Sequence, residues 1–227
     1  MFTIIFINTI KAMSVKLSKI LVCVGTCSEL IKCAPVIKSL EERGVELVVV
    51  NVGRNAGLRQ SLLEQLDVRI DYHLEAARFG QSVNVLGGRL LDRLGTVLEY
   101  ENPDLVLVQG DSASAALASL AAGQRSIPLG HLDAVQHAGN LLSEFPEEIH
   151  RRKIGRGAGH HFVVTESDRR TLLDEGRAAD SVHVVGNIHA SRSRDVFGDG
   201  HAAERICDLL LGTRNTRYAS LPLLLAA

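Results

Sequence analysis

Short apolar runs alternate with longer segments of helical periodicity, and this alternation is the strongest constraint on the fold. The apolar runs are almost continuously aliphatic, which is typical of strands buried on both faces of a sheet. They cover residues 19–25, 45–52, 104–110, 127–132, 161–166 and 182–187. Apolar positions at helical spacing occur in residues 30–44, 58–67, 83–103, 112–124, 146–155 and 166–176. The sequence therefore predicts an α/β fold, a doubly wound parallel sheet with right-handed crossovers and helices on both faces.

Composition narrows the class of protein further. The net charge of −1 provides no basic surface for nucleic acid. The apolar run at residues 2–7 is too short to span a membrane and follows no positive region, so neither a signal peptide nor a membrane partner is expected. The cysteines form no C-x-x-C pair, which argues against a zinc site and favours a cytoplasmic location; they are Cys23, Cys27, Cys33 and Cys207.

The chain is expected to divide into an N-terminal extension at 1–18, a Rossmann-like domain at 19–190 and a C-terminal tail at 191–227. Met13 resembles a natural start, so we expect residues 1–12 to add nothing to the fold. The regular pattern decays after Asn187, although residues 191–212 are compatible with one more helix. The tail is too short for a further Rossmann unit.

Ligands of such a sheet bind beyond the carboxyl ends of its strands, so the residues that follow each strand are candidates for a site. Most of them are small, polar or charged. They are Gly25-Thr26-Cys27-Ser28, Gly53-Arg54-Asn55, Gly110-Asp111-Ser112, His131-Leu132-Asp133, Thr165-Glu166-Ser167 and Gly186-Asn187.

Asp111 and Lys32 each allow two interpretations. Asp111 precedes a helix rich in small residues, where an aspartate is a common N-cap. Its carboxylate is alternatively a ligand-facing group, with the Ser112 hydroxyl and exposed helix amides beside it. Lys32, one turn into the first helix, is either an ordinary surface lysine or a cation for an anionic ligand such as a diphosphate.

The segment that follows the strand at 127–132 is equally ambiguous. His131, Asp133 and His137 are compatible with metal ligation, but no fourth ligand stands at a suitable spacing, so a polar loop is favoured and no metal site is predicted. Glu147 follows Pro146 at a predicted helix start, where proline and acidic residues are common in any helix. Alternatively, if the carboxylate of Glu147 is desolvated there, it is a candidate general acid or base. Residues 151–153 are expected to form a solvated basic face.

An ordered set of motifs resembles one family. The motifs are VGTCSELIKCAP, PDLVLVQGDSASAALASLAA, IPLGHLDA, FPEEIHRR, HHFVVTESDRR and VVGN, across roughly residues 19–190. The sequence is similar to the N-terminal half of non-hydrolysing UDP-N-acetylglucosamine 2-epimerases. That resemblance implies one half of a GT-B-type two-domain fold, with UDP-GlcNAc and UDP-ManNAc interconverted by C2 deprotonation, UDP elimination and re-addition.

The resemblance also implies roles for individual residues. Asp111, Asp133 and Glu147 correspond to catalytic carboxylates. The residues that correspond to substrate-binding positions are Gly25, Thr26, Lys32, Ser112, His131, Arg151 and Glu166. The chemistry requires carboxylates on both faces of the sugar and cations at the leaving diphosphate.

Several positions depart from the family pattern. Cys27 stands where the family has an arginine near the diphosphate, and Asp133 stands where it has a glutamate. His150 replaces an asparagine. The family's second domain, with most UDP contacts and a catalytic histidine, is expected to be missing from this chain. The alternative to an active epimerase is a degenerate or truncated nucleotide-sugar-binding remnant. A homodimer and a separate second-domain chain both remain open as partners.

Overall fold

The computed structural model describes residues 17–53, 58, 60–74, 82–135, 146–189 and 198–213. Its centre is a seven-stranded sheet in the order β3-β2-β1-β4-β5-β6-β7, and every strand pair is parallel. The strands are β1 (Lys19–Val24), β2 (Glu46–Asn51), β3 (Tyr72–His73), β4 (Leu105–Gln109), β5 (Leu129–Leu132), β6 (His160–Val163) and β7 (Val182–Val184). The predicted doubly wound parallel sheet is confirmed.

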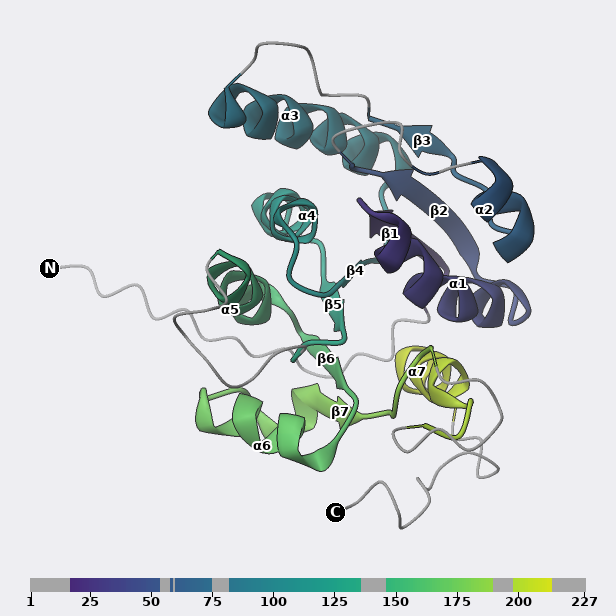
Figure 1. The fold of residues 1–227 in the computed structure, drawn as a ribbon, viewed down its shortest axis with the longest axis vertical. Helices are drawn as coiled ribbons and strands as arrows, with labels where there is room; N and C mark the ends of the chain where they lie inside the picture. The colour runs from purple at the N-terminus through teal and green to yellow at the C-terminus, as the bar shows by residue number, and fades with distance from the viewer. Residues whose placement is uncertain are drawn as a thin grey trace, which may run out of the picture.

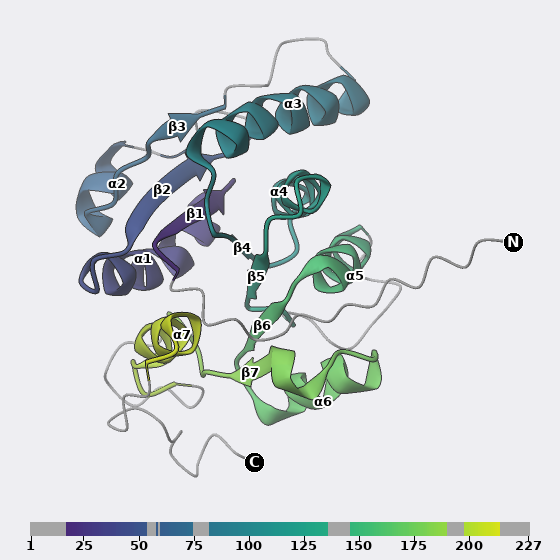
Figure 2. The same ribbon diagram turned by 180° about the vertical axis from the view of Figure 1, so that it is seen from behind.

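Helices cover both faces of this sheet (Figure 1; Figure 2 from behind). They are α1 (Cys27–Glu41), α2 (Gln60–Leu66), α3 (Val83–Glu101), α4 (Ala113–Gln124), α5 (Glu147–Gly157), α6 (Glu166–Asp174) and α7 (Ala202–Leu211), with a 3₁₀ turn at Ala179–Ser181. The core under α1, α2 and α7 is separate from the core under α3, α4 and α5. Successive side chains of β1 point to opposite faces of the sheet. Ile20 and Val22 therefore belong to the first core, and Leu21 and Cys23 to the second.

The strand ends differ slightly from the sequence prediction, for local reasons. β6 ends at Val163 because Thr165 already caps α6, its hydroxyl accepting the Asp168 N–H at 3.1 Å. β3 was not predicted, because a strand of two residues has no detectable alternation. It pairs with β2 through the register Val50 to Tyr72.

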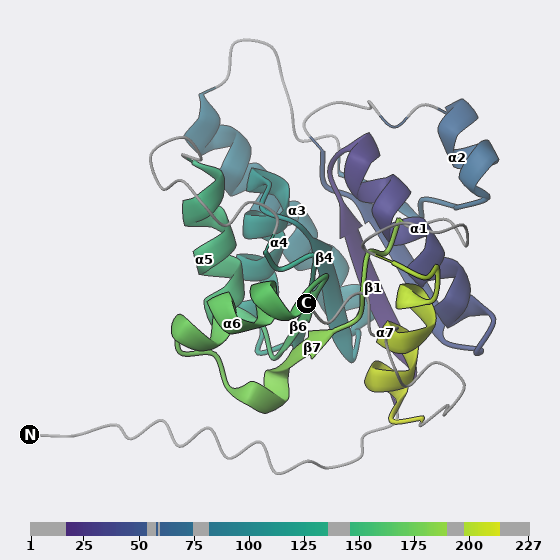
Figure 3. The same cartoon turned by 60° about the horizontal axis from the view of Figure 1, so that its bottom comes forward.

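α7 lies within the predicted tail and packs beside α1, as Figure 3 shows from below. Ile206, Cys207 and Leu210 join the core that α1 covers. The Arg43 guanidinium at the end of α1 contacts the Asp208 carboxylate at 3.0 Å. A domain boundary at residue 190 would exclude this helix, whereas α7 buries its apolar face on the same sheet and is part of the same folded unit.

Candidate functional site

The site predicted from the sequence lies where the strand order reverses. In the sheet, β1 lies between β2 and β4. The helix that follows β1, α1, covers one face of the sheet, and the helix that follows β4, α4, covers the opposite face. Such a switch point opens a crevice at the carboxyl ends of the two strands. Gly25-Thr26 and Gly110-Asp111-Ser112 therefore lie next to each other at this edge.

The turn between β1 and α1 is closed by a capping arrangement. The Thr26 hydroxyl accepts the N–H of Glu29 at 3.2 Å, and the Glu29 carboxylate accepts the N–H of Gly25 at 2.5 Å. Glu29 is 5% exposed, and this burial raises the pKa of its carboxyl. Gly25 and Thr26, both predicted substrate-binding residues, are thus engaged with Glu29.

The turn between β4 and α4 carries Asp111. Ser112, not Asp111, is the N-cap of α4, its hydroxyl accepting the N–H of Ala115 at 3.0 Å, so the interpretation of Asp111 as the cap is wrong. Gly110 has a φ of 72°, a conformation that glycine adopts without strain. Two histidines hold the backbone of this turn: His131 Nε2 donates to the Gly110 carbonyl at 2.7 Å, and His150 Nδ1 to the Asp111 carbonyl at 3.2 Å.

Lys32 and Asp133 form an ion pair at the same edge. Lys32 Nζ lies 3.0 Å from Asp133 Oδ2, and Gln109 Nε2 donates to the same oxygen at 3.0 Å. The Asp133 side chain is 7% exposed and the Lys32 side chain 28%. Asp133 has a φ of 49°, in the left-handed region that residues other than glycine rarely adopt. The structure thus brings together a predicted catalytic carboxylate and the predicted substrate-binding cation.

The first turn of α5 lies beside the Asp111 turn, because His150 contacts the Asp111 carbonyl one turn after Glu147. Glu147 is exposed at the helix start. Its neighbour Glu148 is paired instead with Arg151, by Nε at 2.7 Å and Nη2 at 2.8 Å. These bonds, with a further contact from Arg152, lower the pKa of Glu148 to about 2.

Arg151 is enclosed by carboxylates. Its guanidinium also donates to Glu175, by Nη1 at 3.2 Å and in a second bond by Nη2, and its side chain is 6% exposed. Residues 151–153 therefore do not form one solvated face, although Arg152 and Lys153 are exposed. A contact between Arg151 and substrate stays a prediction, because four of its five N–H donors already bind these carboxylates.

The remaining predicted residues take peripheral or buried positions. Glu166 begins α6 beyond the end of β6 and pairs with Arg169 at 3.2 Å. His131 is 0% exposed, and burial lowers its pKa to about 4, so the ring is neutral at pH 7. The His131 side chain is connected to the candidate site by its hydrogen bond to the Gly110 carbonyl. His137, Arg54 and Asn55 lie outside the described residues.

Sequence reasoning did not select Glu29, Gln109 or His150 as site residues. Glu29 stood three residues after Thr26, the spacing of a capping box, which was a usable signal. Gln109 is the last residue of β4 and follows a run of apolar residues, so the sequence pattern assigned it to a buried strand and not to the site. For His150 the contact with Asp111 bridges separate elements, so no local pattern could identify it.

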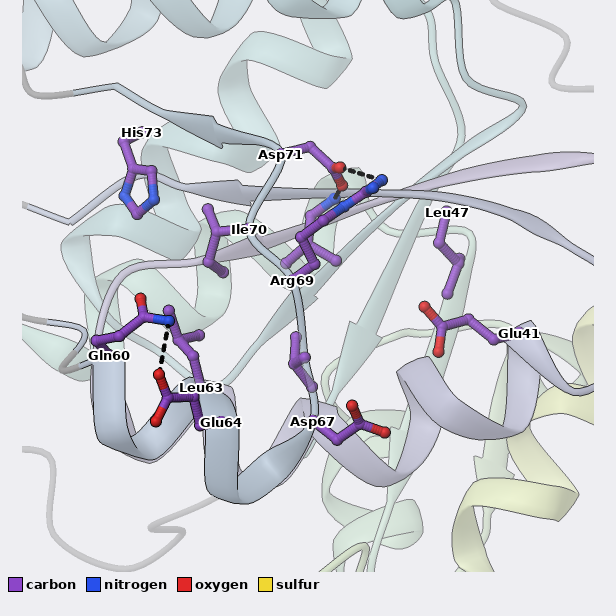
Figure 4. A pocket seen from close by; sticks show the side chains of 12 residues that line it. Glu41, Leu47, Gln60, Leu63, Glu64, Asp67, Arg69, Ile70, Asp71 and His73 are labelled. Atoms are coloured by element: carbon purple, nitrogen blue, oxygen red, sulfur yellow. Dashed lines mark hydrogen bonds and ion pairs between the residues drawn. The ribbon is translucent and has the colours of Figure 1, made fainter.

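A cavity of about 680 Å³ lies elsewhere, between α1, α2, β2 and β3 (Figure 4). Its walls carry the carboxylates of Glu41, Glu64, Asp67 and Asp71, over an apolar floor that includes Leu63. Arg69 pairs with Asp71 at 2.6 Å. The lining residues include no predicted site residue, so this cavity is distinct from the crevice between β1 and β4.

Within the described part of the chain, no cluster of His, Cys, Asp or Glu has the arrangement of a metal site. Across the same residues, no helix has the length and apolar character needed to cross a membrane. All four cysteines are thiols in the structure.

The fold is that of a doubly wound α/β protein, and the candidate ligand site lies at its topological switch point, where the Lys32–Asp133 pair and the Asp111 turn are found. The family model for UDP-N-acetylglucosamine 2-epimerase matches residues 38–193. The chain belongs to this family.

Individual relatives agree with this assignment. A Ralstonia solanacearum protein named "Probable UDP-N-acetylglucosamine 2-epimerase" is 39% identical over 172 residues, which are 75% of this chain and 46% of the relative. The Yersinia pestis UDP-N-acetylglucosamine 2-epimerase is 35% identical over 74% of this chain and 45% of its own length. The solved Neisseria meningitidis UDP-GlcNAc 2-epimerase, bound to UDP-GlcNAc, superposes with a TM-score of 0.70 at 35% identity, covering 75% of this chain and 47% of that one. This chain therefore spans about half the length of the relatives it matches.

Proposed function

We propose that this protein acts on UDP-N-acetylglucosamine and takes part in its interconversion with UDP-N-acetylmannosamine. The observation that carries the proposal is the Lys32–Asp133 pair with Gln109, at the edge where the Asp111 turn also lies. Family membership supports the substrate, and the Neisseria meningitidis relative was solved with UDP-GlcNAc bound.

The reaction needs a base at C2 of the sugar and an acid–base group on the opposite face, because the proton leaves one face and returns to the other. Asp111, Asp133 and Glu147 are the proposed carboxylates. Asp111 follows β4, Asp133 follows β5 and Glu147 begins α5, so they come from three separate segments around the proposed sugar site. Elimination places negative charge on the departing UDP. The ammonium of Lys32 is the proposed cation for that charge, because 28% of its side chain is exposed at the crevice.

The proposal extends to partners and location. A second chain that contributes to the site is proposed, either another copy or a polypeptide that resembles the remaining part of the relatives. A cytoplasmic location is proposed because all four cysteines are thiols.

The test is solvent exchange at the sugar. The purified chain is incubated with UDP-GlcNAc in deuterated water, and proton NMR follows the C2 position. Loss of the C2 proton with appearance of UDP-ManNAc is the expected result. Asp111→Asn and Glu147→Gln should each slow that exchange by about a hundredfold or more. UDP-GlcNAc binding by a folded chain without C2 exchange would favour the nucleotide-sugar-binding remnant. Absence of binding would reject the proposed substrate.

A further inference from the structure

Gln109 is a buried polar side chain at the end of β4, and its amide contacts a carboxylate beyond the end of β5. It is 2% exposed, and its Nε2 donates to Asp133 Oδ2 at 3.0 Å. An ionised carboxylate accepts hydrogen bonds and donates none, so the amide nitrogen of Gln109 faces Asp133. Lys32 Nζ lies 3.0 Å from the same oxygen. This oxygen therefore has one donor from the sheet and another from α1.

The alternation of side chains along β4 explains the direction of the Gln109 side chain. Leu105 and Leu107 belong to the core that α1 covers. Gln109 continues this series by two residues, so its side chain lies on the face of the sheet where α1 carries Lys32. At a position where a third leucine would extend the core, the strand thus presents a hydrogen-bond donor.

The backbone around Asp133 is held on both sides. The N–H of Gly110 donates to the Leu132 carbonyl at 2.9 Å, and the N–H of Ala134 donates to the Phe162 carbonyl at 3.1 Å. Asp133 is itself 6% exposed. Because the backbone is fixed, the side-chain torsions decide where the carboxylate points, and the contacts to Oδ2 restrict those torsions.

The two donors differ in how a ligand can affect them. Lys32 carries a charge and 28% of its side chain is exposed, so an anionic ligand can attract its ammonium away from Asp133. Gln109 is neutral, buried and part of a central strand, so the charge of a ligand does not compete for it.

We infer that Gln109 is a positioning residue: it keeps the Asp133 carboxylate oriented while Lys32 turns to the diphosphate of a bound ligand, without contacting that ligand itself. The catalytic meaning of this role rests on the proposed function. The hydrogen bond by which Gln109 holds Asp133 does not.

Exchange of the Gln109 side-chain amide protons, measured by NMR, tests this hold. In Asp133→Gly, which removes the carboxylate and suits the φ of 49°, the two Nε2 protons should exchange at least about tenfold faster than in the wild type. Asp133→Asn keeps an acceptor oxygen and should give an intermediate effect. The internal control is Gln124, exposed at the end of α4, whose amide protons should exchange equally in all variants. Unchanged exchange at Gln109 in Asp133→Gly would overturn the inference.

Addition of UDP to the wild-type chain tests the exchange of partners at Lys32. At saturation the ammonium signal of Lys32 should shift, while the Nε2 protons of Gln109 exchange within about twofold of their rate in the free protein. A tenfold rise in the exchange at Gln109 would show that the ligand releases it from Asp133 and would overturn the inference. A UDP complex without a shift at Lys32 would overturn it as well.

The rate of C2 exchange separates positioning from simple stability. Gln109→Leu removes the donor and should slow C2 exchange about tenfold at saturating UDP-GlcNAc, while the affinity stays within about twofold because Lys32 is intact. Gln109→Glu has the same shape but sets a second carboxylate against Asp133, so it should slow C2 exchange further. Gln124→Glu is the matched control and should change neither rate nor affinity.

An unchanged rate in Gln109→Leu, or equal losses of rate and affinity, would overturn the positioning role. If the wild-type chain does not bind UDP-GlcNAc or does not exchange its C2 proton, the proposed function fails. The amide exchange in Asp133→Gly then decides alone whether Gln109 holds Asp133.

Discussion

The two sets of paired charges around the crevice are built differently. The Lys32–Asp133 pair is one contact of 3.0 Å, with 28% of the lysine side chain exposed. The Arg151 cluster (Arg151, Glu148 and Glu175) surrounds a guanidinium that is 6% exposed with carboxylates on two sides. An ammonium that is partly exposed keeps donor capacity for a ligand, whereas four of the five N–H donors of the buried Arg151 guanidinium bind carboxylates. The comparison favours the first set for the proposed ligand recognition and the second for support of α5.

The largest effect on stability is expected from Arg151→Ala. Removal of the guanidinium leaves Glu148 and Glu175 partly buried and facing each other, so the free energy of unfolding should fall by about 3–5 kcal/mol. Urea unfolding followed by circular dichroism measures this change. Arg152→Ala is the matched control, because that side chain is 48% exposed and its removal should cost less than about 1 kcal/mol. Equal costs for the two variants would refute the structural assignment of the Arg151 cluster.

The next largest loss of stability is expected at low pH, through buried histidines in the region of the Arg151 cluster. Burial lowers the pKa of His131 to about 4 and that of His161 to about 3, and the charge of Arg151 contributes at His131. In the unfolded chain a histidine has a pKa of about 6.5, so the unfolded state binds more protons below that pH. The stability that these neutral rings contribute is present above about pH 6.5 and is lost as the pH falls toward about 4 and 3.

The measurement is the urea unfolding free energy at pH 7.5, 6.5 and 5.5. His161→Gln removes one of the buried titrating rings and should flatten the pH dependence relative to the wild type. A wild-type slope retained in His161→Gln would show that His161 does not titrate as its burial requires.

A smaller effect on stability is expected from breaking the Lys32–Asp133 pair. A double-mutant cycle with Lys32→Met and Asp133→Asn should give a coupling energy of about 1 kcal/mol, because the pair is partly exposed and Gln109 remains as a partner of Asp133. Lys32→Met should still weaken UDP-GlcNAc binding about tenfold or more. A large coupling energy without any loss of affinity would reverse the comparison and make this pair structural.

The sequence was sufficient for every strand of the described sheet except β3, and it was insufficient for these side-chain partners. Continuous aliphatic runs such as residues 104–110 predict buried parallel strands, because burial on both faces leaves few other choices. Asp111 could be placed at a strand end, but its distinction from the cap depended on Ser112 taking that role. Glu175 contacts Arg151 from the end of a different helix, and no local spacing contains that information. Tertiary contacts of this kind decide which of several similar charges is available to a ligand.

The smallest change in stability is expected from Cys27→Arg, at the first residue of the helix that carries Lys32. The family has an arginine there, and in this chain the side chain is partly buried against the core that α1 covers. A cation at a helix N-terminus opposes the helix dipole, so the variant should be destabilised by less than about 1 kcal/mol. The same substitution adds a bidentate donor at the start of the helix that carries Lys32, so UDP should bind about tenfold more tightly, as measured by calorimetry at constant salt. Cys27→Lys is the charge-matched control, and it should give less of the gain because it lacks the planar fork of the guanidinium. Unchanged UDP affinity in both variants would place the diphosphate away from this turn and would remove Lys32 as its proposed cation.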